Sequence, residues 1–209
     1  MMRGRIMAAV KFVAAILLVV CAAPSPASPV SATTVAESAK SLPAPTIEVK
    51  PESLVEKEFR TFGQVLAVQE GIQPSLENAT MKRWNGLAKG KMHENTEYSM
   101  VDLKVREHLL AEMERNTRSP VLMVALKGDF LLAVAPTSAK GGMLHPDASR
   151  TRVFELHEGE GVLLNKGCWH ALPFPRAKDG RILLAYRSGV TNKKDLPSRP
   201  FRGREVVKF

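Results

Sequence analysis

Two apolar segments joined by a short turn most constrain the fold of this chain. Residues 121–126 read VLMVAL, residues 130–136 read FLLAVAP, and Lys127-Gly128-Asp129 separates them. Two short apolar runs around a glycine-containing turn predict a β-hairpin. Both runs are apolar on both faces, which a half-exposed surface strand would not be. We therefore expect this pair at the centre of a β-sandwich or a small barrel.

Further short segments, punctuated by glycine and proline, extend this pattern. We expect strands at residues 64–69, 96–106, 153–156, 162–164, 169–174 and 181–187. Such a series is typical of an all-β sandwich or barrel. Residues 51–62 begin with a proline and carry apolar residues at helical spacing, which predicts a short N-terminal helix. Residues 108–115 are ambiguous, because their composition favours a helix while their alternation fits a strand.

The N-terminal residues have a different composition. Arg3, Arg5 and Lys11 precede an uncharged apolar run at residues 12–23, and small residues follow. This arrangement is typical of a secretory signal peptide, and the run is short for a membrane span. We expect a secreted or periplasmic protein, free of the membrane once the signal is removed. An uncleaved signal anchor is the second interpretation, and a mitochondrial presequence is the third.

The rest of the chain divides into three parts by composition. Residues 24–50 are rich in Pro, Ser, Ala and Thr and poor in large apolar residues, which predicts a disordered linker. Residues 51–189 form the predicted domain. Residues 190–209 are polar and basic, and we expect a loosely packed tail there.

The charge and the cysteines exclude some functions. The net charge of +9 favours an anionic partner. The basic residues are scattered and form no patch interleaved with aromatic residues, which argues against nucleic acid. Cys21 and Cys168 are too few for a cysteine-rich metal site. Cys168 is a minor candidate for a nucleophile. A soluble protein with a basic surface is the simpler interpretation of this charge.

His170 is the residue best suited to acid–base chemistry near neutral pH. It ends the segment GVLLNKGCWH, in which an apolar strand meets the turn Lys166-Gly167 and the next strand begins. The spacing of Gly161, Gly167 and His170 resembles the second motif of cupins.

A longer part of the chain resembles the ureidoglycolate lyase family, whose fold is of the cupin type. The resemblance is carried by Phe62-Gly63, KRWNGLA at residues 82–88, EMERN and the two apolar runs at 112–136, and FELHEGEGVLLNKGCWHALPF at 154–174. It implies a double-stranded β-helix, or jelly-roll barrel, with a strand at 108–115. It also implies a homodimer and a lyase that splits ureidoglycolate to glyoxylate and urea in allantoin (purine) catabolism.

The sequence departs from the family pattern at three positions that could face a pocket. Asn85 and Asn116 stand where the family has histidine, and Ala171 stands where a second histidine typically follows the tryptophan. Asparagine donates hydrogen bonds but cannot exchange a proton. An exported cupin that binds a small carboxylate or sugar, either without catalysis or with a different activity, is therefore the alternative function, and a structural secreted domain is a third.

Cleavage of ureidoglycolate needs a base for the hydroxyl proton and an acid for the leaving nitrogen. We expect His170 as the base and Glu112 or Glu114 as the acid, provided that a pocket raises the carboxyl pKa. Arg83 is suited to clamp the substrate carboxylate. The remaining candidates for substrate binding are Asn85, Asn116, Lys166 and Trp169.

We expect no cofactor. Many cupins hold a divalent ion with two histidines and a glutamate on one strand and the histidine of the second motif. This chain has no His-x-His before the apolar pair, so a divalent metal, with Glu112, Glu114 and Asn116 assisting His170, is the minor alternative.

Overall fold

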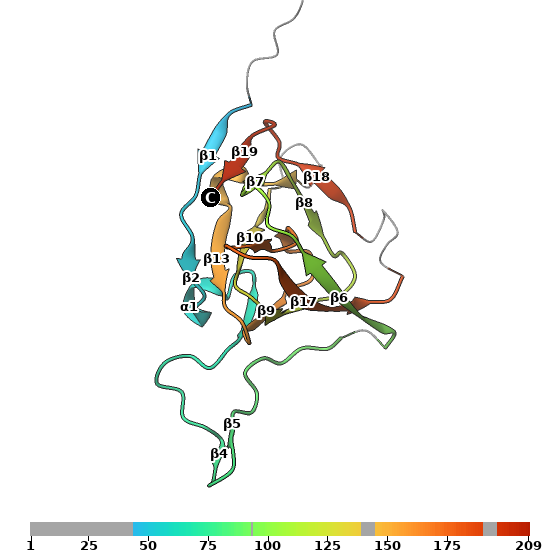
Figure 1. The fold of residues 1–209 in the computed structure, drawn as a ribbon. Helices are drawn as coiled ribbons and strands as arrows, with labels where there is room; N and C mark the ends of the chain where they lie inside the picture. Colours follow the sequence, from blue (N-terminus) through green and yellow to red (C-terminus); the bar gives the residue numbers. More distant parts are fainter. Residues whose placement is uncertain (1–43, 93, 139–144, 190–195) are drawn as a thin grey trace, which may run out of the picture. The chain divides into compact units, whose positions relative to one another are not determined.

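The computed structural model describes residues 44–92, 94–138, 145–189 and 196–209 (Figure 1). The predicted signal peptide, Cys21 and the linker as far as residue 43 lie outside these ranges. Among the described residues, no helix has the length and apolar character needed to cross a membrane.

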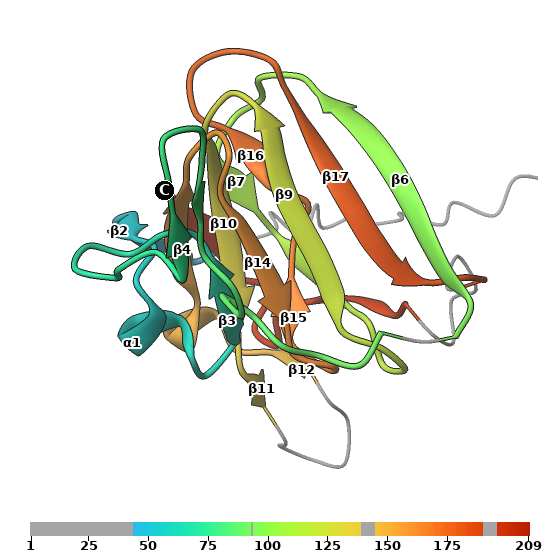
Figure 2. The same cartoon turned by 90° about the horizontal axis from the view of Figure 1, so that it is seen from below.

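The regular secondary structure of the described chain is almost entirely β-strand. A five-stranded sheet has the order β3 (Gly63–Leu66), β14 (Gly161–Leu164), β9 (Val121–Lys127), β17 (Gly180–Arg187) and β6 (Thr96–Leu103). A seven-stranded sheet has the order β18 (Ser198–Pro200), β8 (Glu112–Arg115), β15 (Trp169–His170), β10 (Phe130–Ala135), β13 (Arg152–Leu156) and β2 (Glu52–Ser53), and β16 (Phe174–Pro175) also pairs with β10. Figure 2 shows β9, β17 and β6 side by side.

Smaller elements complete the fold. A three-stranded sheet consists of β1 (Thr46–Glu48), β19 (Val206–Lys208) and β7 (Leu109–Leu110). Two isolated pairs are β4 (Leu76–Glu77) with β5 (Lys82–Arg83), and β11 (Thr137–Ser138) with β12 (His145–Pro146). The helical elements are α1 (Glu56–Phe59) and the 3-10 helix η1 (Ala148–Arg150). This is the expected all-β, jelly-roll class with a short N-terminal helix.

The two central apolar segments are strands, but the predicted hairpin is wrong. β9 pairs with β14 and β17 in the five-stranded sheet, whereas β10 pairs with β13, β15 and β16 in the seven-stranded sheet. The turn between them therefore carries the chain from one sheet to the other. Gly128 has φ +82°, a conformation that suits glycine. Two adjacent apolar runs predict strands, but they do not say whether those strands pair with each other.

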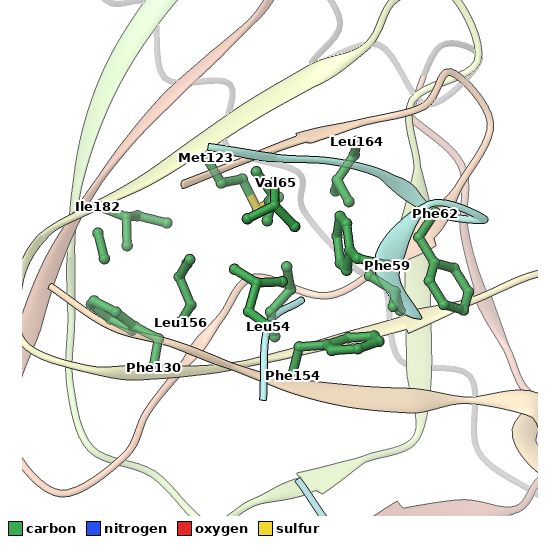
Figure 3. Packing of buried hydrophobic residues seen from close by; sticks show 14 of the residues in the cluster. Leu54, Phe59, Phe62, Val65, Met123, Phe130, Phe154, Leu156, Leu164 and Ile182 are labelled. Atoms are coloured by element: carbon green, nitrogen blue, oxygen red, sulfur yellow. The ribbon is translucent and has the colours of Figure 1, made fainter. Parts of the chain in front are cut away.

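The main core lies between the two large sheets (Figure 3). Val65, Met123 and Leu164 contribute to it from the five-stranded sheet, and Phe130 and Phe154 from the seven-stranded sheet. Phe154 meets Phe59 of α1 edge-on, with ring centroids 5.1 Å apart. All six residues of β10 are buried because alternate side chains enter this core and a second core on the other face of the sheet.

The C-terminal residues complete the second core, which corrects the prediction of a loosely packed tail. β18 pairs with β8, and β19 pairs with both β1 and β7. Phe201 and Val207 are fully buried in the second core. The sequence does not indicate that these residues join the core, because most of the C-terminal residues are polar and only a few apolar side chains face inward.

The N-terminal elements differ from prediction as well. β1 lies within the segment predicted as a linker, so the folded part begins before Pro51. The predicted helix at 51–62 is reduced to α1, because β2 takes its first residues into the seven-stranded sheet. Arg152 binds the carboxylates of Glu52 and Glu58 and so holds this segment against β13. Residues 108–115 form β7 and β8, as the family resemblance implied.

Candidate functional site

A cavity of about 210 Å³ opens between the two large sheets. Side chains from β8, β9, β15 and β17 line it, and these strands are distant from one another in the sequence. Its lining residues are Glu114, Asn116, Val121, Met123, His170, Leu172, Leu184, Tyr186 and Leu196. Three predicted site residues, His170, Glu114 and Asn116, therefore share one cavity.

A larger hollow of about 600 Å³ lies beside η1 and the C-terminal turn. Asp147, Arg202 and Glu205 are among its lining residues, and none of the predicted site residues lines it. It is open to solvent, and no histidine is among its described lining residues. The smaller cavity is therefore the candidate site.

Strand pairing explains which side chains reach the cavity. β15 and β8 are antiparallel neighbours, with His170 opposite Glu114 and Trp169 opposite Arg115. Successive side chains on a strand point to opposite faces of the sheet. His170 and Glu114 therefore face the cavity, whereas Trp169 packs in the second core on the other face.

His170 forms one hydrogen bond with the described residues, through one of its two ring nitrogens. Its Nδ1 lies 3.0 Å from the carbonyl oxygen of Cys168. A carbonyl only accepts, so Nδ1 carries the proton of the neutral ring and Nε2 keeps its lone pair. Nε2 lies 3.9 Å from Oε1 of Glu114, which is beyond hydrogen-bond distance.

The two groups have pKa values displaced in opposite directions. Burial lowers the pKa of His170 to about 4, and the hydrogen bond to Cys168 opposes this only in part. Burial, followed by the nearby charge of Glu112, raises the pKa of the Glu114 carboxyl. Both shifts favour the neutral forms over an ion pair. The lowered pKa of His170 keeps its Nε2 lone pair available, and the raised pKa of Glu114 favours the protonated carboxyl.

Asn116 and Tyr186 add polar groups to the cavity. Oδ1 of Asn116 accepts from the backbone N–H groups of Arg118 (3.3 Å) and Ser119 (3.2 Å), which leaves its amide N–H₂ as a donor. The hydroxyl of Tyr186 donates to a carboxylate oxygen of Glu97 at 3.3 Å. We did not predict Tyr186 from the sequence, although it alternates with the inward-facing Leu184 along its strand.

Five predicted site residues lie outside the described lining of the cavity. Glu112 shares a strand with Glu114 but is exposed. Arg83 and Asn85 are exposed in and just after β5, far along the chain from the cavity strands. Lys166 is exposed in the turn before β15, and Trp169 is buried on the opposite face. The structure thus brings together the histidine, one glutamate and one asparagine.

The described residues do not fit a metal site of the cupin type. No group of three or more His, Cys, Asp or Glu side chains is arranged to hold an ion within the described ranges. His170 and Glu114 would supply two ligands, and Asn116 uses its oxygen in a turn. Burial also raises the pKa of Cys168 to about 12, which disfavours a thiolate near neutral pH.

Comparisons with known proteins identify one family. A family model described as ureidoglycolate lyase matches residues 46–202. A structure of recombinant oxalate oxidase in complex with glycolate is 14% identical and covers 59% of this chain and 72% of its own, with a TM-score of 0.28. Another, of oxalate oxidase in complex with the substrate analogue glycolate, is 12% identical and covers 66% and 76%, with a TM-score of 0.28. A search of curated proteins finds no match.

Proposed function

The chain belongs to the ureidoglycolate lyase family, and we propose that it cleaves ureidoglycolate to glyoxylate and urea. The observation that carries this proposal is the pair formed by His170 and Glu114. Both side chains line one cavity, 3.9 Å apart, with pKa values displaced toward a free base and a protonated acid. The reaction needs one group of each kind.

In the proposed step, Nε2 of His170 takes the proton from the substrate hydroxyl. The oxygen then forms the carbonyl of glyoxylate, and the bond between the carbon and the ureido nitrogen breaks. The electron pair of that bond goes to nitrogen, which takes the proton of Glu114 and leaves as urea. No oxidant or reductant is needed, since one proton is removed and one is supplied.

The same geometry would return His170 and Glu114 to the protonation states that they had before the reaction. After cleavage His170 holds an extra proton and Glu114 has lost one. Their separation of 3.9 Å is beyond hydrogen-bond distance, so the proton would return through one water. A buried imidazolium and a buried carboxylate attract each other strongly, which favours this return.

Binding of the substrate would depend on neutral donors. None of the described residues that line the cavity is a lysine or an arginine. The amide N–H₂ of Asn116 is the candidate donor, and Tyr186 on β17 lines the same cavity with its hydroxyl proton donated to Glu97. A bound carboxylate next to Nε2 would also raise the pKa of His170 and so strengthen the base.

The direct test is turnover of ureidoglycolate by the folded protein, measured as released glyoxylate and urea. We expect His170→Ala and Glu114→Gln each to lower kcat by about 10²- to 10⁴-fold, the range for one positioned acid or base. Glu112→Gln should cost much less, because this exposed side chain affects the site only through its charge.

His157→Ala serves as the histidine control, because His157 is half exposed in a turn outside the cavity. Each variant is checked for folding by circular dichroism. A wild-type protein without turnover, or a Glu114→Gln variant with full turnover, contradicts the proposal.

A second candidate function is the binding of a small carboxylate or sugar without catalysis. The apolar side chains that dominate the cavity and the weak basicity of buried His170 favour it. Calorimetric titration with glycolate would show binding that is lost in Asn116→Ala, together with no release of urea from ureidoglycolate.

Export and assembly remain part of the proposal. We expect residues 1–23 to direct the chain into the secretory pathway or the periplasm, and the mature protein to form a homodimer. A mass measurement of the mature N-terminus tests the first expectation.

A further inference from the structure

Two hydrogen-bond donors are buried without acceptors on the face of the seven-stranded sheet that lies opposite the cavity. Trp169 is fully buried, and its indole Nε1 has no hydrogen-bond partner among the described residues. Nε of Arg115 is likewise buried and unpaired within the described chain. Buried hydrogen-bond donors nearly always have an acceptor in native proteins. Two buried donors without acceptors on paired strands therefore require an explanation.

These donors belong to one cluster. Trp169 and Arg115 stand opposite each other on β15 and β8, and the guanidinium carbon of Arg115 lies 4.9 Å from the centre of the indole ring. Arg199 on the next strand, β18, pairs with Met113, two residues before Arg115. Its side chain therefore starts on the same face as Arg115.

Within the described residues, the cluster carries positive charge without a counterion. No carboxylate there pairs with Arg115 or Arg199, and Nη1 of Arg199 donates to the carbonyl of Ser198 at 3.1 Å. The neighbouring acids Glu112 and Glu114 alternate with Arg115 along β8 and so start on the opposite face. Burial and the charge of Arg199 both lower the pKa of Arg115, as expected for cations that lack an anion.

We infer that Arg115, Arg199 and the indole N–H of Trp169 form a binding site for a small oxyanion such as phosphate, sulfate or a carboxylate. A guanidinium presents paired donors that match two oxygens of such an anion. Arg199 is exposed and Arg115 is half-buried, so solvent reaches the guanidinium groups from the β18 side, whereas the indole of Trp169 is fully buried. It lies on the opposite face of the sheet from His170, and it does not depend on the proposed lyase activity.

Trp169 provides a direct probe of this site. The chain has two tryptophans, so Trp84→Phe leaves Trp169 as the only indole fluorophore. Sodium phosphate, sodium sulfate and sodium acetate are titrated separately into this variant, with sodium chloride at matched ionic strength as the reference. We expect a saturable change in fluorescence with at least one oxyanion and none with chloride.

Substitutions at the cluster then identify the site. Arg115→Met and Arg199→Met, each in the Trp84→Phe background, should weaken oxyanion binding by about tenfold or more, the loss expected for one charge-assisted hydrogen bond. Arg60→Met, which removes an exposed arginine after α1, should leave the affinity unchanged. If Arg115→Met fails to fold, the exposed position 199 still provides the test.

Calorimetry on Trp169→Phe tests the role of the indole N–H, because phenylalanine keeps an aromatic face for Arg115. Weaker oxyanion binding supports the site. The absence of saturable binding by all three anions overturns the inference, as does an affinity that Arg115→Met and Arg199→Met leave unchanged. Turnover of ureidoglycolate, measured in the same variants, reports on the cavity separately.

Discussion

His170 and Trp169 are neighbours in the chain and have unrelated surroundings. His170 faces a cavity that also holds a carboxyl group, whereas Trp169 lies in an apolar core beside a guanidinium. The alternation of side chains along β15 produces this division. The proton chemistry of His170 follows from burial, because a buried imidazole resists taking a second proton.

The buried state of His170 predicts a loss of stability in acid. The pKa of His170 is about 4 in the folded protein and 6.5 for an unperturbed histidine. Between these values the unfolded chain binds more protons, so the free energy of unfolding falls as the pH drops from 6.5 to 4. The contribution of His170 to this fall is roughly 3 kcal/mol. Urea denaturation across this range should show a shallower decrease for His170→Gln.

Glu114 is present in both the wild-type protein and the His170→Gln variant. Its raised folded-state pKa acts in the opposite direction, since it adds stability below its unfolded pKa that is lost as the pH rises through the folded value. The difference between wild type and His170→Gln therefore reports on His170. Parallel pH profiles of the two proteins would show that the imidazole is not buried as described.

The burial of an individual strand depends on the strands with which it pairs. β10 is buried on both faces because β13 and β15 flank it and a core lies on each side. β18 and β19, which are short and flanked by charged residues, close the second core around Phe201 and Val207. The C-terminal residues are therefore structural elements of the domain.

The burial of Phe201 can be tested by truncation of its side chain. Phe201→Ala should lower the free energy of unfolding by about 3–5 kcal/mol, the usual cost of removing a buried phenylalanine. Arg202→Ala, at the exposed neighbouring position, should change it by less than about 0.5 kcal/mol. Guanidinium denaturation monitored by circular dichroism measures both. Equal stability of the two variants would favour a free tail.

Within the described residues, part of the outer face of the five-stranded sheet is an exposed apolar surface. On the outer face of the five-stranded sheet, Met100 lies opposite Leu183, and Leu183 lies opposite Val124. Met100 and Tyr98, on the edge strand β6, are each 70% exposed. An apolar surface that crosses several strands is typical of an association site.

This surface is where we expect the proposed homodimer to form, because a two-fold interface uses the same patch twice. Met100→Lys should shift the protein from dimer to monomer, since each dimer would bury two unpaired charges. Sedimentation velocity measures the change, and Val68→Lys, at an exposed apolar position off the two large sheets, is the control. A Met100→Lys variant that stays dimeric would place the interface elsewhere.

The sequence by itself determined the strand class, most strand positions and the family, and it predicted His170 as a site residue. These properties depend on local periodicity, turn residues and motif spacing, which involve residues close together in the sequence. Only the tertiary structure decided that β9 and β10 belong to different sheets and that Glu114, rather than Glu112, shares the cavity with His170. It also brought Tyr186 and Leu196 to that cavity. Pairing between strands far apart in the chain determines which side chains share the cavity. The residue pattern within one segment does not specify which other strand that segment pairs with.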